Sequence, residues 1–455
     1  MELRRIETPG IAHYAYLIGD AGKAAVVDPR RDVDEYVWLA HSLGLQIEYV
    51  IETHRQEDFV MGAAHLAEWT GACIVNGDHD QFGHGDIRLS DGDTFDLGGL
   101  RFRALHTPGH TPESMSYAVY APEAGEQAWG VFTGDALFFG DTGRTDLADA
   151  DRARENAELL YDMVHAKIAP LGEATLVLPA HGPGSVCGSG MAPRPISTVG
   201  AERHYNQVFM LDRAAFADRK ASERIPRPPY FEHMEEVNLG GGLPPLRMPD
   251  SVPRLAPEDF IDRGERGKII DTRKPEAFAG GHVPGAYAVW MGGLPIFGGW
   301  VASHETSVYL VTNDDAEIAE AVRHLSRIGV DRVTGALAGG FDAWRGSAQP
   351  IETLGVTTPH RLAEQRGAVA VVDVRDEDEY AGGHVAGARH LYVGHLDDGV
   401  LDLDLNQSAP VAVTCSIGNR SGLGASILKR HGFRDVRNVL GGMTAWERMG
   451  LPIER

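Results

Sequence analysis

The chain has 455 residues, which predicts about three domains, and its 65 acidic against 42 basic residues give a formal net charge of −23 that argues against a general nucleic-acid binder. A hydrophobic content of 43% is typical of a globular protein, and three cysteines exclude a disulfide-built scaffold and fit a reducing compartment. Because the sequence has neither an apolar leader nor a run of about 18 apolar residues, we expect a cytoplasmic protein that does not enter a membrane.

The first 240 residues alternate apolar runs with polar loops. Runs such as YVIETH, GVFTGD and ATLVLPAHG are typical of strands, and many of them end in His, Asp or Gly. Helical patterns lie between some of them, at residues 60–69 and 152–168. Residues 219–257 are rich in Pro, Gly and charge, which is typical of a linker. We therefore expect a first domain, with its C-terminal linker, at residues 1–240.

Four of the loops in this domain carry histidine or aspartate directly after an apolar run. They are THRQEDF (53–59), HTPGHT (106–111), FTGDA (132–136) and PAHG (179–182). In order and spacing they resemble the metallo-β-lactamase superfamily, whose hallmark is HxHxDH followed by a distant His, Asp and His. The resemblance covers residues 1 to about 215 and implies an αββα fold with a metal site.

At two positions the sequence departs from this hallmark. Gln56 stands where the family has its second histidine, and Phe59 stands where it has the last one. Phe cannot ligate a metal and Gln is a poor ligand for zinc, so a two-zinc hydrolytic site would lose one imidazole from each metal. His54, His110 and Asp135 remain, and two histidines with one carboxylate form the facial triad of non-haem Fe(II) oxygenases.

The segment FTGDALFFGDTGRTD (132–146) is similar to the persulfide dioxygenase branch of the superfamily. That resemblance implies one Fe(II) per chain, held by the two histidines and the aspartate. It also implies a thiol persulfide of glutathione, coenzyme A or a similar carrier, which is oxidised by O2 to sulfite and the free thiol. Two alternatives stay open: a zinc thioester hydrolase of the glyoxalase II type, and a sulfur-carrier scaffold whose metal domain is degenerate.

Other residues of this domain have two interpretations each. Asp58 and His181 are expected to hydrogen-bond the metal ligands or a water rather than to bind the metal themselves. Arg144 either holds a carboxylate of the thiol carrier or forms an ion pair with Asp146.

Two of the three cysteines fall in this domain. Cys187 follows in the Gly-rich loop after His181, where it is either a relay thiol that receives sulfur near the metal or a partly buried loop residue. We expect Cys73 in the core of a strand.

The rest of the chain contains a duplicated segment. GGHVPGA begins at residue 280 and GGHVAGA at 382, KIID ends at 271 and VVD at 373, and GGFDAW begins at 339 and GGMTAW at 441. All three pairs are 102 residues apart, which indicates two copies of one domain, at residues 250–353 and 354–455. Short apolar runs alternate with helical stretches in each copy, and this alternation predicts a parallel α/β sheet.

The third cysteine, Cys415, begins the loop CSIGNRS between an apolar run and a helical stretch. Backbone N–H groups of such a loop, together with the start of a helix, stabilise a thiolate or a persulfide. The domain resembles rhodanese, a sulfurtransferase that carries sulfur as a cysteine persulfide, and Arg420 is expected to orient an anionic sulfur donor or acceptor. The loop residues expected to bind the sulfur substrate are Ser416, Gly418, Asn419 and Ser421.

The first copy has lost this chemistry. Asn313 stands at the position equivalent to Cys415, and Ile318 at that equivalent to Arg420. We therefore expect a non-catalytic rhodanese homology domain with a structural role, such as packing, dimerisation or spacing of its neighbours.

The order of the three domains resembles bacterial sulfide-detoxification fusion enzymes. The resemblance implies that Cys415 takes sulfane sulfur from a persulfide and passes it to sulfite to form thiosulfate, or works in reverse from thiosulfate. We also expect a homo-oligomer.

Overall fold

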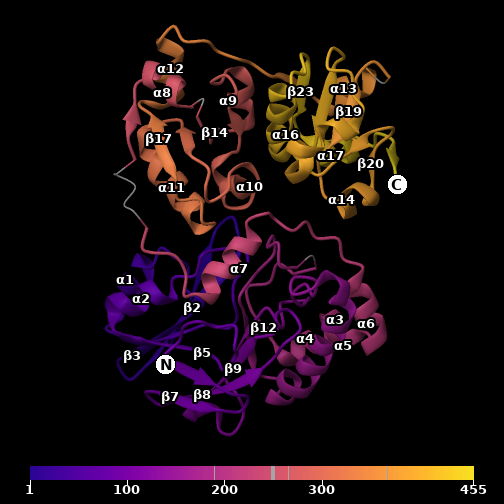
Figure 1. The fold of residues 1–455 in the computed structure, drawn as a ribbon. Coiled ribbons are helices and arrows are strands. Elements are labelled where there is room, and N and C mark those ends of the chain that lie inside the picture. The colour runs from indigo at the N-terminus through magenta and orange to yellow at the C-terminus, as the bar shows by residue number, and fades with distance from the viewer. Residues whose placement is uncertain (189, 247–251, 265, 366) are drawn as a thin grey trace. The chain divides into compact units, whose positions relative to one another are not determined.

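The computed structural model describes residues 1–188, 190–246, 252–264, 266–365 and 367–455 (Figure 1). The chain divides into two compact units, one made of residues 1–227 and 231–246 and the other of residues 228–230 and 247–455. Among the described helices, none is long and apolar enough to cross a membrane.

The N-terminal unit contains two mixed sheets of six strands each. The first sheet has the order β1-β2-β3-β4-β5-β6, and the second has the order β12-β11-β10-β9-β8-β7. The strands are β1 (Glu2–Thr8), β2 (His13–Asp20), β3 (Lys23–Val27), β4 (Gln46–Ile51), β5 (Cys73–Gly77), β6 (Ile87–Leu89), β7 (Thr94–Leu97), β8 (Leu100–His106), β9 (Met115–Tyr120), β10 (Gly130–Gly134), β11 (Leu176–Pro179) and β12 (Ser197–Thr198).

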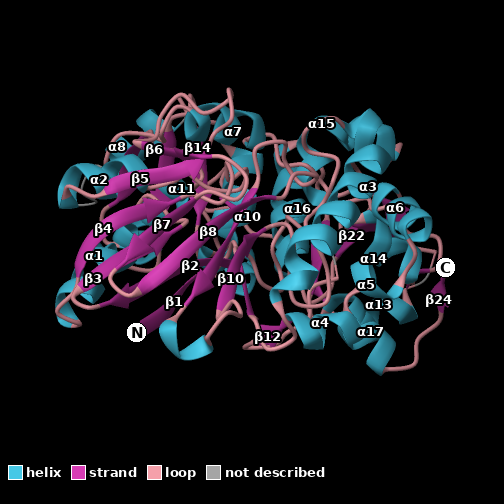
Figure 2. Ribbon diagram, turned by 90° about the horizontal axis from the view of Figure 1, so that it is seen from below, coloured by secondary structure: helices cyan, strands magenta, loops and turns pink. Residues whose placement is uncertain are grey.

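Successive side chains along a strand point to opposite faces of its sheet, so that each sheet packs against the other sheet on one face and against helices on the other. The result is a sandwich of four layers. On β2, Tyr14, Tyr16 and Ile18 face the core between the two sheets, while Ala15 and Leu17 face the core under helices α1 and α2. The second sheet buries its other face under a further set of helices. The helices of this unit are α1 (Asp34–Ser42), α2 (Ala63–Thr70), α3 (Ala153–Met163), α4 (Val199–Tyr205), α5 (Gln207–Met210), α6 (Arg213–Ala221) and α7 (Phe231–Leu239). In Figure 2, α1 and α2 lie beside β3 and β4.

The helical patterns predicted in this unit are confirmed. The pattern at residues 152–168 forms α3, which continues as a π-helix over Val164–Ile168. The pattern at residues 60–69 forms α2. The prediction for Cys73 is wrong, because its side chain is exposed: it is the first residue of β5, and burial begins with Ile74.

The second unit contains two domains with parallel five-stranded sheets of the same topology. The orders are β13-β17-β16-β14-β15 and β18-β23-β22-β19-β21. The strands are β13 (Arg254–Leu255), β14 (Lys268–Asp271), β15 (Tyr287–Ala288), β16 (Val308–Val311), β17 (Val333–Leu337), β18 (Gly355–Thr357), β19 (Ala370–Asp373), β21 (Arg389–His390), β22 (Val411–Thr414) and β23 (Val436–Val439), and β20 (His384–Val385) pairs separately with β24 (Ile453–Glu454). The helices are α8 (Pro257–Gly264), α9 (Pro275–Gly280), α10 (Leu294–Val301), α11 (Ile318–Arg327), α12 (Gly340–Gly346), α13 (Pro359–Glu364), α14 (Glu377–Gly382), α15 (Leu396–Gly399), α16 (Asn419–Arg430) and α17 (Gly442–Arg448).

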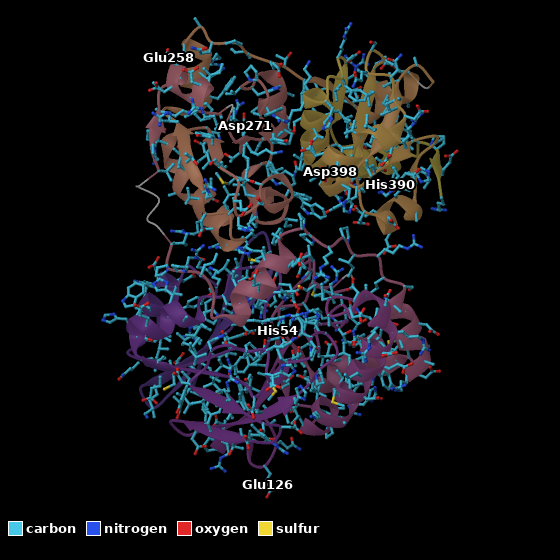
Figure 3. The ribbon with its side chains drawn as sticks, in the orientation of Figure 1. His54, Glu126, Glu258, Asp271, His390 and Asp398 are labelled. Carbon is cyan, nitrogen blue, oxygen red and sulfur yellow. The ribbon has the colours of Figure 1, made fainter. Side chains whose placement is uncertain are left out.

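The duplication extends to individual hydrogen bonds. Arg273 donates from Nη2 to Oδ2 of Asp271 at 2.6 Å, and Arg375 donates in the same way to Asp373 at 2.8 Å. Each arginine also donates to a glycine carbonyl eight residues further along the chain. Asp271 lies at the end of β14 (Figure 3). The two copies therefore keep the same buried ion pair, which holds the end of the first central strand in both domains.

The first of these two domains packs against the second. Asp397 accepts hydrogen bonds from Tyr287 Oη at 2.9 Å and from His431 Nε2 at 2.8 Å. On α16, Ser426 Oγ accepts from the backbone N–H of Ala288 at 3.1 Å. The helix that follows the Cys415 loop is thus supported by the neighbouring domain.

Candidate functional site

The ends of four strands bring the predicted metal residues together. His54 follows β4, His110 follows β8, Asp135 follows β10 and His181 follows β11, and all four side chains are buried. His54 lies in the interior of the N-terminal unit (Figure 3). Asp135 Oδ2 is 3.4 Å from Nε2 of His110 and 3.8 Å from Nε2 of His54. These three donor atoms converge on one point.

Neighbouring groups fix the orientation of both imidazoles. Nδ1 of His110 lies 2.8 Å from the carbonyl oxygen of Arg144, and because a carbonyl only accepts, Nδ1 carries the proton. Nδ1 of His54 lies 2.9 Å from Oγ1 of Thr53, whose hydroxyl itself donates to Asp28 and therefore accepts from the ring. In both rings Nδ1 faces this partner and Nε2 faces Asp135, so Nε2 is the atom that can bind a metal once it carries no proton.

Glu57 joins this cluster, and the sequence did not reveal it. Its Oε2 is 3.5 Å from Nε2 of His110, and donor atoms of His54, Glu57 and His110 all lie within 4.8 Å of one another. Gln56, which stands where the family has a histidine, is thus followed directly by the buried carboxylate of Glu57. The only signal in the sequence was that the loop HRQEDF carries two adjacent acidic residues where the family motif needs one.

The donor set fits a bound metal ion. Nε2 of His54, Nε2 of His110, Oδ2 of Asp135 and both oxygens of Glu57 are buried and have no hydrogen-bond partner among the described residues. Burying unpaired carboxylates is costly, and a cation at their centre offsets that cost. Imidazole nitrogen and carboxylate oxygen suit iron and zinc alike.

Charge within the cluster shifts its pKa values in opposite directions. Burial lowers the pKa of His54 to about 4. Burial acts in the same direction on His110, but the carboxylates of Glu57 and Asp135 raise its pKa to about 9. For Asp135 burial would favour the neutral acid, yet His181 and His54 hold its pKa far below the ordinary value. The carboxylate of Asp135 is therefore ionised and available as a ligand.

Asp58 and His181 form a hydrogen-bonded chain with Asp135. His181 lies 2.8 Å from Asp135 through Nδ1 and 3.0 Å from Asp58 through Nε2. Burial opposes it, but these two carboxylates raise the pKa of His181 well above its ordinary value. Cys187 lies beside this chain, with Sγ within 4.8 Å of donor atoms of Asp58 and His181. Burial and the nearby carboxylates raise the pKa of the Cys187 thiol, so that it is neutral.

The two residues that depart from the family hallmark occupy separate places. The amide Nε2 of Gln56 is 3.4 Å from Nδ1 of His54, whereas Nε2 of the same ring faces Asp135. Phe59 packs against His13 at a ring-centroid distance of 4.2 Å and forms a small apolar cluster with Ile11 and Met61.

Arg144 lies in the ion pair with Asp146 that the sequence left as one of two alternatives. Its Nε and Nη2 donate to the two carboxylate oxygens of Asp146 at 2.7 and 2.6 Å. The remaining guanidinium donors reach backbone carbonyls of Val186, Ile225 and Pro226, and the side chain is 2% exposed. The guanidinium thus holds the loops that surround His110, and its donors are all used within the protein.

A second site lies in the last domain, where Cys415 directly follows β22 and α16 begins at Asn419. The backbone N–H of Gly418 donates to Sγ of Cys415 at 3.1 Å. The hydroxyl of Ser421 lies 3.3 Å from the same sulfur and 2.7 Å from Oδ1 of Asn438, so it can donate to only one of them at a time. The loop thus directs donors toward the sulfur, as a thiolate or persulfide requires.

Arg420 at the mouth of this loop is already paired. Its Nη1 and Nη2 donate to the two carboxylate oxygens of Glu379 at 2.6 and 2.8 Å. Ser416 Oγ accepts from Arg420 at 2.7 Å and donates to Glu379 at 2.7 Å. Asp376 adds a second carboxylate 3.8 Å from Nη1. Burial acts in the opposite direction, but Arg420 lowers the pKa of Glu379 to about 2.

The equivalent loop of the first copy holds no nucleophile. Asn313 donates from Nδ2 to both oxygens of Glu317 at 2.8 and 2.9 Å, and its backbone N–H also donates to Glu317. Ile318 begins α11, where the other copy has Arg420. The Glu317 carboxylate is therefore hydrogen-bonded to both the side chain and the backbone N–H of the residue that replaces the cysteine.

Comparisons with known proteins match each part of the chain. Residues 8–181 match the Metallo-beta-lactamase superfamily, and residues 256–347 and 358–449 each match the Rhodanese-like domain. Persulfide dioxygenase ETHE1, mitochondrial, from Bos taurus is 28% identical over 248 residues, which cover 53% of this chain and 89% of that protein. A probable metallo-hydrolase from Burkholderia pseudomallei (strain 1710b) is 31% identical over 210 residues, covering 38% of this chain and 69% of that protein. The crystal structure of a metallo-beta-lactamase from Staphylococcus aureus subsp. aureus COL, 27% identical, aligns with a TM-score of 0.66 and covers 74% of this chain and 99% of its own.

One buried residue of α7 holds the loop that carries His54 and Glu57. Nδ2 of Asn238 donates to the carbonyl oxygens of Gln56 at 2.6 Å and Phe59 at 2.8 Å, and its Oδ1 accepts from the N–H of Met61 at 2.9 Å. Replacing Asn238 by Ala leaves three buried backbone groups unpaired.

We expect Asn238→Ala to destabilise the domain by about 3 kcal/mol or more, since each of the three buried polar groups that lose their partner costs about 1–3 kcal/mol. Hydrogen exchange of residues 56–61 should rise in the same variant. Glu236→Ala, an exposed substitution on the same helix, is the control and should change stability by less than about 0.5 kcal/mol. Equal exchange in both variants would show that Asn238 does not hold the loop.

Proposed function

The chain belongs to the metallo-β-lactamase superfamily and carries two rhodanese-like domains, as its motifs predicted, and from this premise we propose that it is a persulfide dioxygenase coupled to a sulfurtransferase. The similarity to a persulfide dioxygenase over most of that protein's length supports the first activity. The observation that carries the proposal is the cluster of buried, unpaired donor atoms at His54, His110 and Asp135.

In this proposal His54, His110 and Asp135 hold one Fe(II) ion per chain. Bound there, the ion supplies the redox chemistry that couples O2 to the oxidation of sulfur. The protein positions both imidazoles through Thr53 and the Arg144 carbonyl. Because these side chains are fully buried, water is largely excluded and the charges of the site act strongly on a bound sulfur anion.

The overall reaction converts RSSH, O2 and H2O into RSH, sulfite and two protons. The outer sulfur of the persulfide is oxidised and O2 is reduced, while the S–S bond breaks and its electron pair leaves with the thiol RSH. Cys187 lies six residues after His181, and we propose that it is the relay thiol, which takes the outer sulfur of RSSH as a Cys187 persulfide while RSH leaves. Its burial beside Asp58 and His181 supports this position.

The second step takes place at Cys415. Its sulfur attacks the outer sulfur of a second RSSH, so that RSH leaves and a Cys415 persulfide remains. Sulfite then attacks that outer sulfur, which releases thiosulfate and restores Cys415; the reverse sequence consumes thiosulfate. The Gly418 N–H supports the negative sulfur in both steps. Two sites on one chain raise the local concentration of the shared sulfite.

The proposed dioxygenase step predicts how much iron the protein binds and how much O2 it consumes. Anaerobically purified protein should hold one iron per chain and consume one O2 for each sulfite formed from glutathione persulfide. His110→Ala should lower iron binding and O2 uptake by at least about a hundredfold, because it removes a ligand. His41→Ala, on the exposed surface of α1, is the control and should leave both unchanged.

Two results would contradict this prediction. Zinc together with thioester turnover would favour a hydrolase of the glyoxalase II type. Absence of bound metal and of O2 uptake would favour a sulfur-carrier scaffold.

The second step predicts that the two activities separate. Cys415→Ser should lower sulfur transfer from thiosulfate to cyanide by at least about a thousandfold, because it removes the nucleophile, while O2 uptake on glutathione persulfide stays unchanged. Cys73→Ser replaces an exposed cysteine and should keep both activities. Transfer that survives in Cys415→Ser would exclude this loop as the sulfurtransferase site.

A further inference from the structure

The carboxylate of Glu57 is not used by the proposed function and yet faces its metal site. The side chain is fully buried, and neither carboxylate oxygen has a hydrogen-bond partner among the described residues. A buried carboxylate without hydrogen bonds is costly, so its place in the fold needs an explanation.

The distance from Glu57 to His110 is that of two ligands that share an ion, and donor atoms of Glu57 and His54 lie within 4.8 Å of each other. Donors bound to one ion at about 2.0–2.2 Å lie no more than about 4.4 Å apart. Glu57 Oε2 is 3.5 Å from His110 Nε2, which is itself 3.4 Å from Asp135 Oδ2. Glu57 thus lies as close to His110 as Asp135 does.

The ion pair with Arg55 does not balance the negative charge of the Glu57 carboxylate. Nε of Arg55 is 3.7 Å from Glu57, but the same guanidinium also faces Glu113 at 3.9 Å and Glu235 at 3.4 Å. One positive charge shared by three carboxylates leaves negative charge uncompensated. A divalent cation between Glu57 and Asp135 would balance both.

We propose that Glu57 is a fourth protein ligand of the metal and takes the place of the imidazole that Gln56 does not supply. This inference rests on the proposed metal site but not on the reaction. It changes the expected site from two histidines and one carboxylate to two histidines and two carboxylates.

Metal affinity tests the inference without an activity assay. Co(II) and Fe(II) are titrated anaerobically into metal-free protein in competition with a chromophoric chelator. Glu57→Gln should weaken binding at least about tenfold and shift the visible absorption of the Co(II) form, because a ligand is lost. Glu235→Gln removes a carboxylate from the same arginine, and its affinity should stay within about twofold of the wild type. Metal-free Glu57→Gln should melt at the same temperature or higher, since a neutral amide replaces an unpaired buried carboxylate.

The outcomes distinguish a failure of the assignment of Glu57 as a ligand from a failure of the proposed metal site itself. If the wild type binds metal and Glu57→Gln binds it equally well, Glu57 is not a ligand although the metal site stands. If both variants weaken binding equally, Glu57 acts only through Arg55. If the wild type binds no metal, both this inference and the proposed dioxygenase fail.

A second inference concerns Glu379 at the mouth of the Cys415 loop, and a comparison of the two copies carries it. The position equivalent to Glu379 in the first copy is Ala277, 102 residues earlier. That copy retains the Asp271–Arg273 ion pair of the shared fold but lacks the cysteine, the arginine and this glutamate. Glu379 is therefore absent where the chemistry is absent, although the fold is kept.

The pair with Glu379 alters what Arg420 can bind. An anionic substrate that uses the guanidinium must displace a carboxylate that makes two short hydrogen bonds to it. Sulfite and thiosulfate carry two negative charges, and they also meet Asp376 near the same arginine. A persulfide on an uncharged carrier carries at most one and needs no such displacement.

We infer that Glu379 determines specificity at Cys415 by raising the KM for the dianions thiosulfate and sulfite relative to organic persulfides. The inference rests on the proposed sulfur transfer. Thiosulfate formation then depends on a high local sulfite concentration, which the dioxygenase site of the same chain would supply.

Steady-state kinetics with two sulfur donors tests this role. Glu379→Gln should lower the KM for thiosulfate, with cyanide as acceptor, about three- to tenfold and leave kcat within about twofold, because the weakened ion pair competes less for Arg420. The KM for the persulfide of 2-mercaptoethanol should change less than about twofold. Asp378→Asn makes the same charge change at an exposed position of α14 and should leave the KM for thiosulfate within about twofold.

Three results would overturn the inference about Glu379. One is an equal decrease of the KM in Asp378→Asn, which would indicate a general effect of charge. Another is an unchanged or higher KM in Glu379→Gln, which would mean that Glu379 positions Arg420 for binding. Absence of transfer from either donor in the wild type would remove the proposed sulfurtransferase as well.

Discussion

The buried charge at the ends of β4, β8 and β10 is the constraint on which the N-terminal domain depends. Carboxylates and imidazoles from loops far apart in the sequence meet there with donor atoms that no other described group satisfies. The fold fixes their backbones through strand ends, through Asn238 and through Arg144 with Asp146. These supports position the donors, but no described group hydrogen-bonds Oδ2 of Asp135 or either oxygen of Glu57, and the proposed metal ion would bind them there.

The same site shows two ways of stabilising a buried carboxylate. Asp58 is paired with His181, whose imidazole lies between Asp58 and Asp135 and contacts both. Phe59 packs against His13 instead of providing a ligand there. Oδ2 of Asp58 is thus hydrogen-bonded within the protein, whereas Oδ2 of Asp135 and both oxygens of Glu57 have no hydrogen-bond partner among the described residues. This difference supports placing the proposed ion beside Asp135 and Glu57.

The sequence predicted the architecture because its signals are local or periodic. Strand ends that carry His and Asp, and three motif pairs 102 residues apart, specify domains without knowledge of contacts. Glu57 could not be predicted in the same way, because adjacent acidic residues in a loop do not reveal which of them points inward. The prediction for Arg420 was also incomplete. Its partner Glu379 lies 41 residues away on another helix, and only the fold brings the two together.

Duplication explains why the last two domains share a fold but not a chemistry. The Asp–Arg pair at the end of the first central strand is buried and its loss would leave an unpaired charge, so both copies need it for stability. The residues around Cys415 carry no such requirement, because the loop of the first copy closes on its own Asn313–Glu317 hydrogen bonds. The inactive copy contributes Ala288, whose N–H donates to Ser426 on α16, and Tyr287, whose hydroxyl donates to Asp397 on α15. The helix that follows the Cys415 loop is therefore packed against its own sheet and also hydrogen-bonded to the inactive copy.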